Sequence, residues 1–228
     1  MRHILSTVTV TALMSISAMA QAPVLTAAQR VDALLSAMGG RDAWARARFV
    51  HVQAMHRDPA LGMYENRIWN DLSEPRIRIE AVIGGDRVMR GIERGAGWRV
   101  RRGEESPLTD AQVESDRAWW EANVYRTLHR LAVNDPALTA RAVGEHRLEI
   151  VRADGRRVNW FVLNSAGEPI QFGTWDDERG SVFGPLVAGT GGIRHWRWGS
   201  SADGTFQFEI SRVDASESVP SGVAFGQR

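Results

Sequence analysis

The side chains best suited to acid–base or metal chemistry in this chain are its histidines. Apart from His3, these are His51, His56, His129, His146 and His195. No two of them stand at the HxH or HExxH spacing that brings two imidazoles to one zinc ion. His51 and His56 are separated by five positions, which places them on opposite faces of a regular strand. Because the chain also has no Cys, the sequence predicts neither a metal site nor a cofactor.

Nucleophilic catalysis has equally little support. The chain has no GxSxG elbow, and no Ser stands in a recognisable nucleophile context. His195 could form an acid–base pair with Glu145 or Asp176, but their spacing does not bring them together. The acidic run at 176–178 is typical of a solvated turn. These patterns predict a protein that is not an enzyme, and a hydrolase with an unrecognised site is the least favoured alternative.

A group of arginines offers a second kind of chemistry. Arg99, Arg101 and Arg102 lie close together, with Arg90 and Arg94 nearby in sequence. Paired guanidinium donors could bind a phosphate or carboxylate headgroup. A solvated hairpin neutralised by neighbouring glutamates is the simpler interpretation, since surface ion pairs are common and weak.

Composition and charge narrow the class of protein. The 228 residues are 43% hydrophobic and 24% charged, which is typical of a globular chain and excludes a mainly disordered one. Every one of the 28 basic residues is Arg, and the net charge is +1. A near-neutral chain without a known binding module is not expected to bind nucleic acid.

The first 22 residues have the features of a secretory signal. A short basic start precedes an uncharged apolar stretch, and the sequence around Ala20 and Ala22 has the small-x-small pattern that signal peptidase cleaves. We therefore expect a signal peptide at 1–22, cleaved near Ala20 or Ala22, and export to the periplasm. We expect no stable transmembrane span after cleavage, since no later apolar run is long enough. Residues 23–228 show no linker and are expected to form a single domain.

The periodicity of this domain predicts an α+β fold. A capping box at Thr26 starts a helix that ends at Gly39-Gly40, and a second capping box starts a helix over 109–134. Period-two segments separated by turn residues indicate strands. The expected architecture is one curved antiparallel half-barrel sheet of about ten strands, with the helices packed against its concave side. The expected strands lie near 49–53, 64–69, 76–80, 87–93, 98–102, 147–153, 156–164, 169–175, 193–198 and 205–212.

Aromatic residues are concentrated on these strands. The chain has nine Trp and only two Tyr. Residues 158–163 are apolar on both faces, which predicts a strand covered on both sides. Trp196 and Trp198 are expected to share a face that continues across the next hairpin. Such aromatics fill a core or line a groove that holds an apolar ligand. The candidate ligand-binding residues are Trp69, Trp98, Trp160, Trp196, Trp198, Phe206 and Phe208.

The order of short motifs carries a family resemblance. The motifs are residues 34–44 leading into the first strand, the Gly97-Trp98 hairpin, a helical insertion ending at 135–138, Asp154-Gly155 followed by Trp160, 167–169, 191–193 and the tail at 219–225. In this order the chain resembles the periplasmic lipoprotein-sorting superfamily of the LolA, LolB and LppX types. The resemblance implies a LolA-like half-barrel wrapped over helices, with an apolar cavity that binds acyl chains or another hydrophobic molecule.

The leading hypothesis is therefore an exported carrier or binding protein that holds a hydrophobic small molecule or lipid. The alternative is an envelope interaction or assembly protein that grips a partner with a sheet edge or with the aromatic hairpin. A cavity between sheet and helices would favour the carrier, and a filled core with an exposed apolar patch would favour the alternative.

Overall fold

The structure, a computed structural model, describes residues 25–226. The expected signal peptide at 1–22 lies outside these residues. The helices are α1 (Ala27–Ala37), α2 (Arg41–Arg46), α3 (Asp110–Glu121) and α4 (Val124–Ala132), with a short 3₁₀ turn at Thr190–Gly192. The strands are β1 (Phe49–Asp58), β2 (Gly62–Asp71), β3 (Ile77–Ile83), β4 (Asp86–Glu93), β5 (Ala96–Arg101), β6 (Glu104–Pro107), β7 (Leu138–Val143), β8 (Arg147–Arg152), β9 (Arg157–Leu163), β10 (Pro169–Thr174), β11 (Ser181–Phe183), β12 (Leu186–Ala188), β13 (Arg194–Trp196), β14 (Trp198–Ser201) and β15 (Gln207–Ser216).

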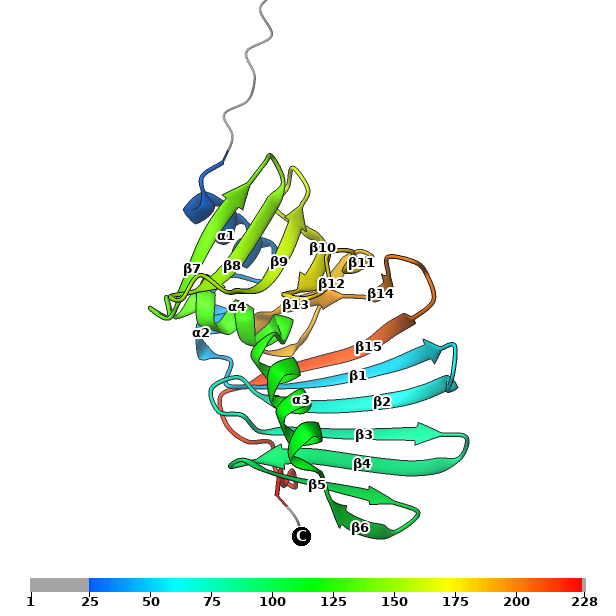
Figure 1. The fold of residues 1–228 in the computed structure, drawn as a ribbon. Coiled ribbons are helices and arrows are strands. Elements are labelled where there is room, and N and C mark those ends of the chain that lie inside the picture. Colours follow the sequence, from blue (N-terminus) through cyan, green and yellow to red (C-terminus); the bar gives the residue numbers. More distant parts are fainter. Residues whose placement is uncertain (1–24, 227–228) are drawn as a thin grey trace, which may run out of the picture.

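The fold is an open, curved antiparallel sheet with helices on its concave side, as predicted (Figure 1). The sheet is larger than predicted. Thirteen strands pair in the order β6-β5-β4-β3-β2-β1-β15-β14-β11-β10-β9-β8-β7, and β12 and β13 form a separate pair. Most of the additional strands are short, such as the three-residue β11 and β12, and three residues are too few to show an alternating pattern. The six-residue β7 (Leu138–Val143) was also missed.

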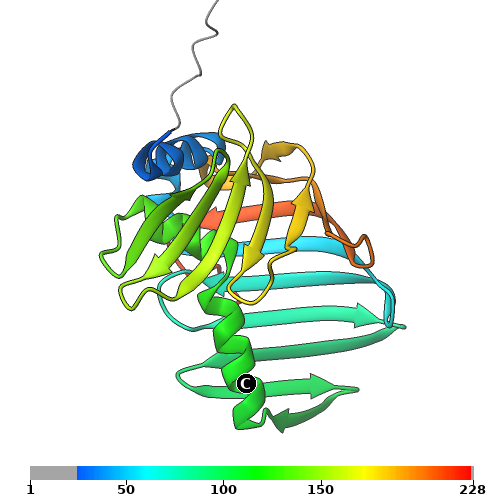
Figure 2. The ribbon, with the colours of Figure 1, turned by 45° about the horizontal axis from the view of Figure 1, so that its top comes forward.

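One strand joins the two halves of the sheet. β1 to β6 form a meander in one half and β7 to β11 with β14 form the other, while β15 lies between β1 and β14. The strands of the second half stand across the direction of those in the first (Figure 2). The sheet therefore bends around the helices that lie between its halves.

The predicted helix over 109–134 is two helices. The chain leaves helical geometry at Ala122 and Asn123, and Asn123 caps α4 by accepting hydrogen bonds from the backbone N–H groups of Tyr125 and Arg126. Trp120 of α3 packs with Ile77 and Ile92 in the first half of the sheet. The apolar residues of α4 belong instead to the main core. The break lets one helical segment pack against two different parts of the bent sheet.

The main core lies under α1, α2 and α4. The capping box of Thr26 and Gln29 starts α1 as predicted, and Leu34 and Leu35 are fully buried. The strand β9 is covered on both faces, as its sequence predicts, because Trp160 and Phe161 are 1% and 0% exposed. Phe161 faces the helices, and Trp160 lies under the loop that follows β10.

A candidate ligand cavity

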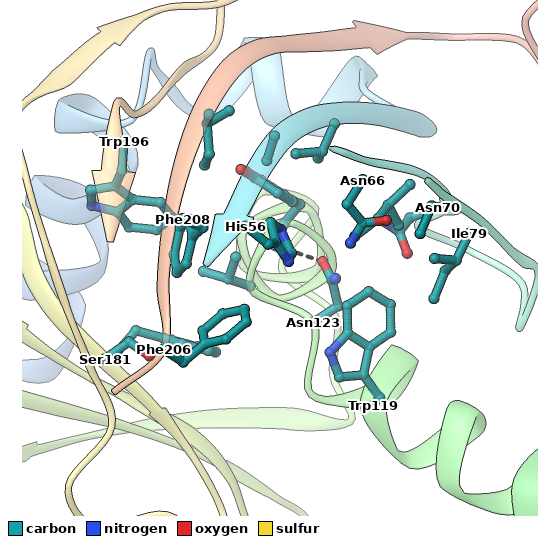
Figure 3. Close-up of a pocket in the computed structure, with 18 of the residues that line it drawn as sticks. His56, Asn66, Asn70, Ile79, Trp119, Asn123, Ser181, Trp196, Phe206 and Phe208 are labelled. Carbon is teal, nitrogen blue, oxygen red and sulfur yellow. Dashed lines mark hydrogen bonds between the residues drawn. The ribbon is translucent and has the colours of Figure 1, made fainter. Parts of the chain in front are cut away.

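A cavity of about 540 Å³ lies on the concave side of the sheet, partly open to solvent. Its walls come from both halves of the sheet and from the segment that joins α3 to α4 (Figure 3). Most of the side chains that face it are apolar. They are Val52, Ala54, Ile68, Ile79, Ala81, Ile83, Val88, Trp119, Ala122, Val124, Tyr125, Phe172, Phe183, Trp196, Phe206, Phe208 and Ile210.

One side of the cavity is aromatic. The Trp196 indole stacks on the Phe183 ring with 4.1 Å between ring centroids, and its Nε1 donates a hydrogen bond to the carbonyl of Pro169. The Phe206 and Phe208 rings lie 6.1 Å apart on the neighbouring wall. Because the indole N–H is satisfied by the backbone, Trp196 presents apolar ring surface to the cavity, and Ser181 is a polar residue on this side (Figure 3).

The opposite side is aliphatic. Ile79, Ala81 and Ile83 alternate along β3 with residues that point to the convex face, and Val88 lies opposite Ala81 on β4. This alternation was readable in the sequence, since Ile77, Ile79, Ala81 and Ile83 share one face of the predicted strand.

His56 and Tyr64 sit between these two sides. They face each other across β1 and β2, and the imidazole Nδ1 lies 3.2 Å from the tyrosine hydroxyl. Burial lowers the pKa of His56 to about 4, although Asp58 acts in the opposite direction. Burial also raises the pKa of Tyr64. Both groups are therefore uncharged at neutral pH.

The cavity wall carries little charge. Arg90 is the one Arg, Asp or Glu among the described residues that line it, and its guanidinium lies 3.1 Å from the carboxylate of Asp116. Burial raises the pKa of Asp116, and the nearby Arg90 opposes this shift. In the arginine cluster considered from the sequence, Arg99 of β5 lies opposite Arg90 of β4 in the strand register. Arg102 forms an ion pair with Asp86.

The structure places three of the seven aromatic candidates on the cavity wall. These are Trp196, Phe206 and Phe208 (Figure 3). Trp198 does not share their face, contrary to the prediction, because the expected strand is interrupted at Arg197. Trp198 begins β14, lies opposite Glu209 and is 44% exposed.

The other three tryptophans lie away from the cavity, each with a structural partner. Trp69 stacks on His51 with 4.6 Å between ring centroids. The indole N–H of Trp98 donates to the carbonyl of Phe225 in the C-terminal tail. That of Trp160 donates to the carbonyl of Asp177. On the convex side of the sheet, Trp69 thus packs against the neighbouring strand β1, Trp98 holds the C-terminal tail and Trp160 holds the loop after β10.

Two other histidines, His51 and His195, occupy structural positions. His51 lies on the face opposite to His56, as the odd spacing predicts, with its Nδ1 3.3 Å from the carboxylate of Asp214. His195 is 3% exposed and its Nδ1 donates to the carbonyl of Trp196, so its contact is neither Glu145 nor Asp176. The part of the chain that the structure describes has no cluster of three or more His, Asp or Glu side chains placed to hold a metal ion.

The sequence prediction missed the polar part of the cavity. Asn66, Asn70 and Asn123 line it together with His56 and Tyr64. The only signal was the alternation of residues 64, 66, 68 and 70 on one face of a predicted strand, and polar side chains on a strand ordinarily indicate its solvent side.

No family model matches this chain. No curated protein matches it either. Three solved structures are similar to it in fold. A LolA superfamily protein from Nitrosomonas europaea is 10% identical, with a TM-score of 0.39, over 89% of this chain and 98% of that one. A putative outer membrane lipoprotein-sorting protein domain from Vibrio parahaemolyticus is 6% identical, with a TM-score of 0.35, over 79% and 91%.

LprF from Mycobacterium bovis is 9% identical, with a TM-score of 0.31, over 88% of this chain and 96% of that one. The likeness of these three structures to this chain is distant. Within residues 25–226, no helix combines the length and the apolar character that crossing a bilayer requires.

Proposed function

We propose that this protein is an exported, non-enzymatic carrier that holds a hydrophobic ligand, a lipid or an acyl chain, in the cavity between its sheet and its helices. The observation that carries the proposal is the 540 Å³ hollow with mainly apolar walls. Its size falls within the roughly 300–1,000 Å³ of typical small-ligand sites. Each ligand methylene that leaves water for such walls contributes about 0.8 kcal/mol.

The same hollow supports the carrier over the alternative. An assembly protein was expected to have a filled core, whereas the bend of the sheet leaves a hollow that α3 and α4 do not fill. The location in this proposal is the periplasm, because residues 1–22 match the pattern of a cleaved signal. The resemblance of the motif order to the lipoprotein-sorting superfamily agrees with both points.

The test measures how tightly a fluorescent apolar dye, N-phenyl-1-naphthylamine, binds to the purified wild type and to a matched pair of variants. Ala81 is 9% exposed and faces the cavity, whereas the next residue, Val82, is 46% exposed and points to the other face. We expect Ala81→Phe to fill part of the cavity and to weaken dye binding at least ~10-fold, the equivalent of about 1.4 kcal/mol. Val82→Phe adds an aromatic ring on the other face and is expected to leave binding unchanged.

Equal effects of the two variants would show that the dye binds elsewhere. Native mass spectrometry of protein isolated from the periplasm, followed by lipid extraction, provides the independent check. A bound lipid supports the carrier. A ligand-free mass, together with no dye uptake, would contradict it.

A further inference from the structure

The inner face of β2 carries a polar track through the cavity. Tyr64, Asn66, Ile68 and Asn70 alternate toward the cavity along this strand, so that three of its four inward positions are polar. At about 3.3 Å per residue, Asn66 lies roughly 7 Å from Tyr64 and roughly 13 Å from Asn70. Polar groups therefore extend along much of the cavity floor.

Both asparagines have an amide oxygen that no described residue satisfies. Asn66 and Asn70 are 8% and 1% exposed, and the Oδ1 atom of each is buried without a hydrogen-bond partner among the described residues. Their cross-strand neighbours are apolar. Asn66 lies between Ala54 and Ala81.

Asn70 lies between Val50 and Ile77 in the same way. An unpartnered buried polar group costs about 1–3 kcal/mol of stability, and native structures contain few of them. Leu would fit the apolar surroundings of either position at lower cost. Two such groups on one cavity floor, at successive polar positions of β2 with Ile68 between them, point to a bound molecule that supplies hydrogen-bond partners.

The position and charge of the track restrict that molecule. The aromatic wall of Phe206, Phe208 and Trp196 lies on one side of it, and the aliphatic wall around Ile79 lies on the other (Figure 3). A ligand that reaches the track must therefore bury apolar surface around its polar atoms. Arg90 is already paired with Asp116, and His56 is neutral. A ligand carboxylate or phosphate on the track would thus be a buried charge without a countercharge, which is strongly unfavourable.

We propose that the cavity selects an uncharged amphiphile, whose hydroxyl or amide groups hydrogen-bond to Asn66 and Asn70 while its acyl chain lies against the apolar walls. This proposal rests on the carrier function and specifies the chemical class of the cargo. An amide side chain can both donate and accept a hydrogen bond, so it matches a hydroxyl or an amide and not a lone charge.

The experiment compares two competitors that share one acyl chain, 1-monooleoylglycerol and oleate, each below its micelle concentration. Both displace N-phenyl-1-naphthylamine from the wild type and from Asn66→Leu, Asn70→Leu and the double variant. We expect the wild type to prefer monooleoylglycerol by about 10-fold or more, since its glycerol hydroxyls can hydrogen-bond to one of the two asparagines, whereas oleate would bury an uncompensated charge there. In the double variant we expect this preference, the ratio of the two competition constants measured against the same dye in the same variant, to fall at least ~5-fold, whatever the change in dye affinity.

Urea unfolding of each variant without ligand is the structural control, and the midpoint is expected to be unchanged or higher because an unpartnered polar group has been removed. Equal affinity of the wild type for the two competitors would overturn the proposal and leave the carrier intact. A preference that survives in the double variant would overturn it in the same way. Failure of both lipids to displace the dye from the wild type would contradict the carrier itself, and this proposal with it.

Discussion

His56 is a histidine that the fold holds in its neutral form. Its ring lies between Tyr64 and Phe206, edge-on to Phe206 with 5.2 Å between centroids. Its pKa is about 4 in the folded protein, because of burial, and about 6.5 in an unfolded chain. Between these values the unfolded state binds a proton that the folded state does not. The free energy of unfolding therefore falls as the pH falls from about 6.5 to about 4.

We expect His56→Gln to lose less stability over this pH range than the wild type. The two proteins should differ in the slope of the free energy of unfolding against pH. This difference should stay below the roughly 1.4 kcal/mol per pH unit that uptake of one full proton gives, since His56 is only partly buried. Urea unfolding at pH 7.5, 6 and 5 measures it. Burial also lowers the pKa of His51 and His195. These two histidines are present in both the wild type and His56→Gln, so their contributions cancel in the comparison. Parallel stability curves would show that His56 does not titrate in this way.

At the level of single residues, the sequence predicted the aromatic wall of the cavity better than its polar floor. The shared face of Phe206 and Phe208 follows from alternation along one expected strand, which local spacing reveals. The inward positions of Asn66 and Asn70 could not be predicted, because a polar residue on a strand ordinarily indicates the solvent-exposed face of the sheet. Trp69, Trp98 and Trp160 were placed by partners far along the chain, such as the Phe225 carbonyl that accepts from Trp98, and spacing does not show such partners.

Among the elements, the segment that joins α3 and α4 has the most direct effect on the cavity. Asn123 starts α4 by accepting hydrogen bonds from Tyr125 N at 3.0 Å and Arg126 N at 3.4 Å. Removal of such a cap costs about 1 kcal/mol, within a range of about 0.5–2 kcal/mol. We expect Asn123→Ala to lower the free energy of unfolding by about this amount.

Asn123→Ser is the matched control, because Ser is an equally good N-cap. We expect it to stay within a few tenths of a kcal/mol of the wild type, as measured by chemical denaturation. An equal loss in both variants would show that the Asn side chain contributes through the cavity wall and not through the cap.

The sequence predicted the ends of this helical segment and missed the interruption within it. Thr109 starts it with a capping box, and Asp135-Pro136 follows it, so both ends carry local signals. The apolar stripe from Val113 to Leu131 continues through the break without Gly or Pro. The interruption arises from tertiary packing, since α3 contacts one half of the sheet and α4 contacts the other.

For the molecule as a whole, β15 is the strand on which the cavity depends. It pairs with β1 on one side and β14 on the other, and it is the link between the two halves of the thirteen-stranded sheet. It also contributes Phe208 and Ile210 to the cavity wall, with Phe206 just before it. Hairpins with tight turns were predictable from local sequence. The pairing of β1 with β15 was not, because these strands are more than 140 residues apart and no local signal connects them.

We expect a chain that ends at residue 205 to lose cooperative unfolding and binding of N-phenyl-1-naphthylamine. A synthetic peptide of residues 205–228 is expected to restore both in part, since it supplies the missing strand and the aromatic residues of the wall. Near-ultraviolet circular dichroism and dye titration with and without the peptide measure this. Full dye affinity in the shortened chain without peptide would show that the site forms without β15.

The position of β15 also bears on when the proposed carrier could take up a ligand. Synthesis runs from the amino end, and β15 is the last strand of the described residues, so the hollow has no complete wall until this strand is added. In the proposed function an unfinished chain would therefore lack a wall of the site, and loading would require the completed strand.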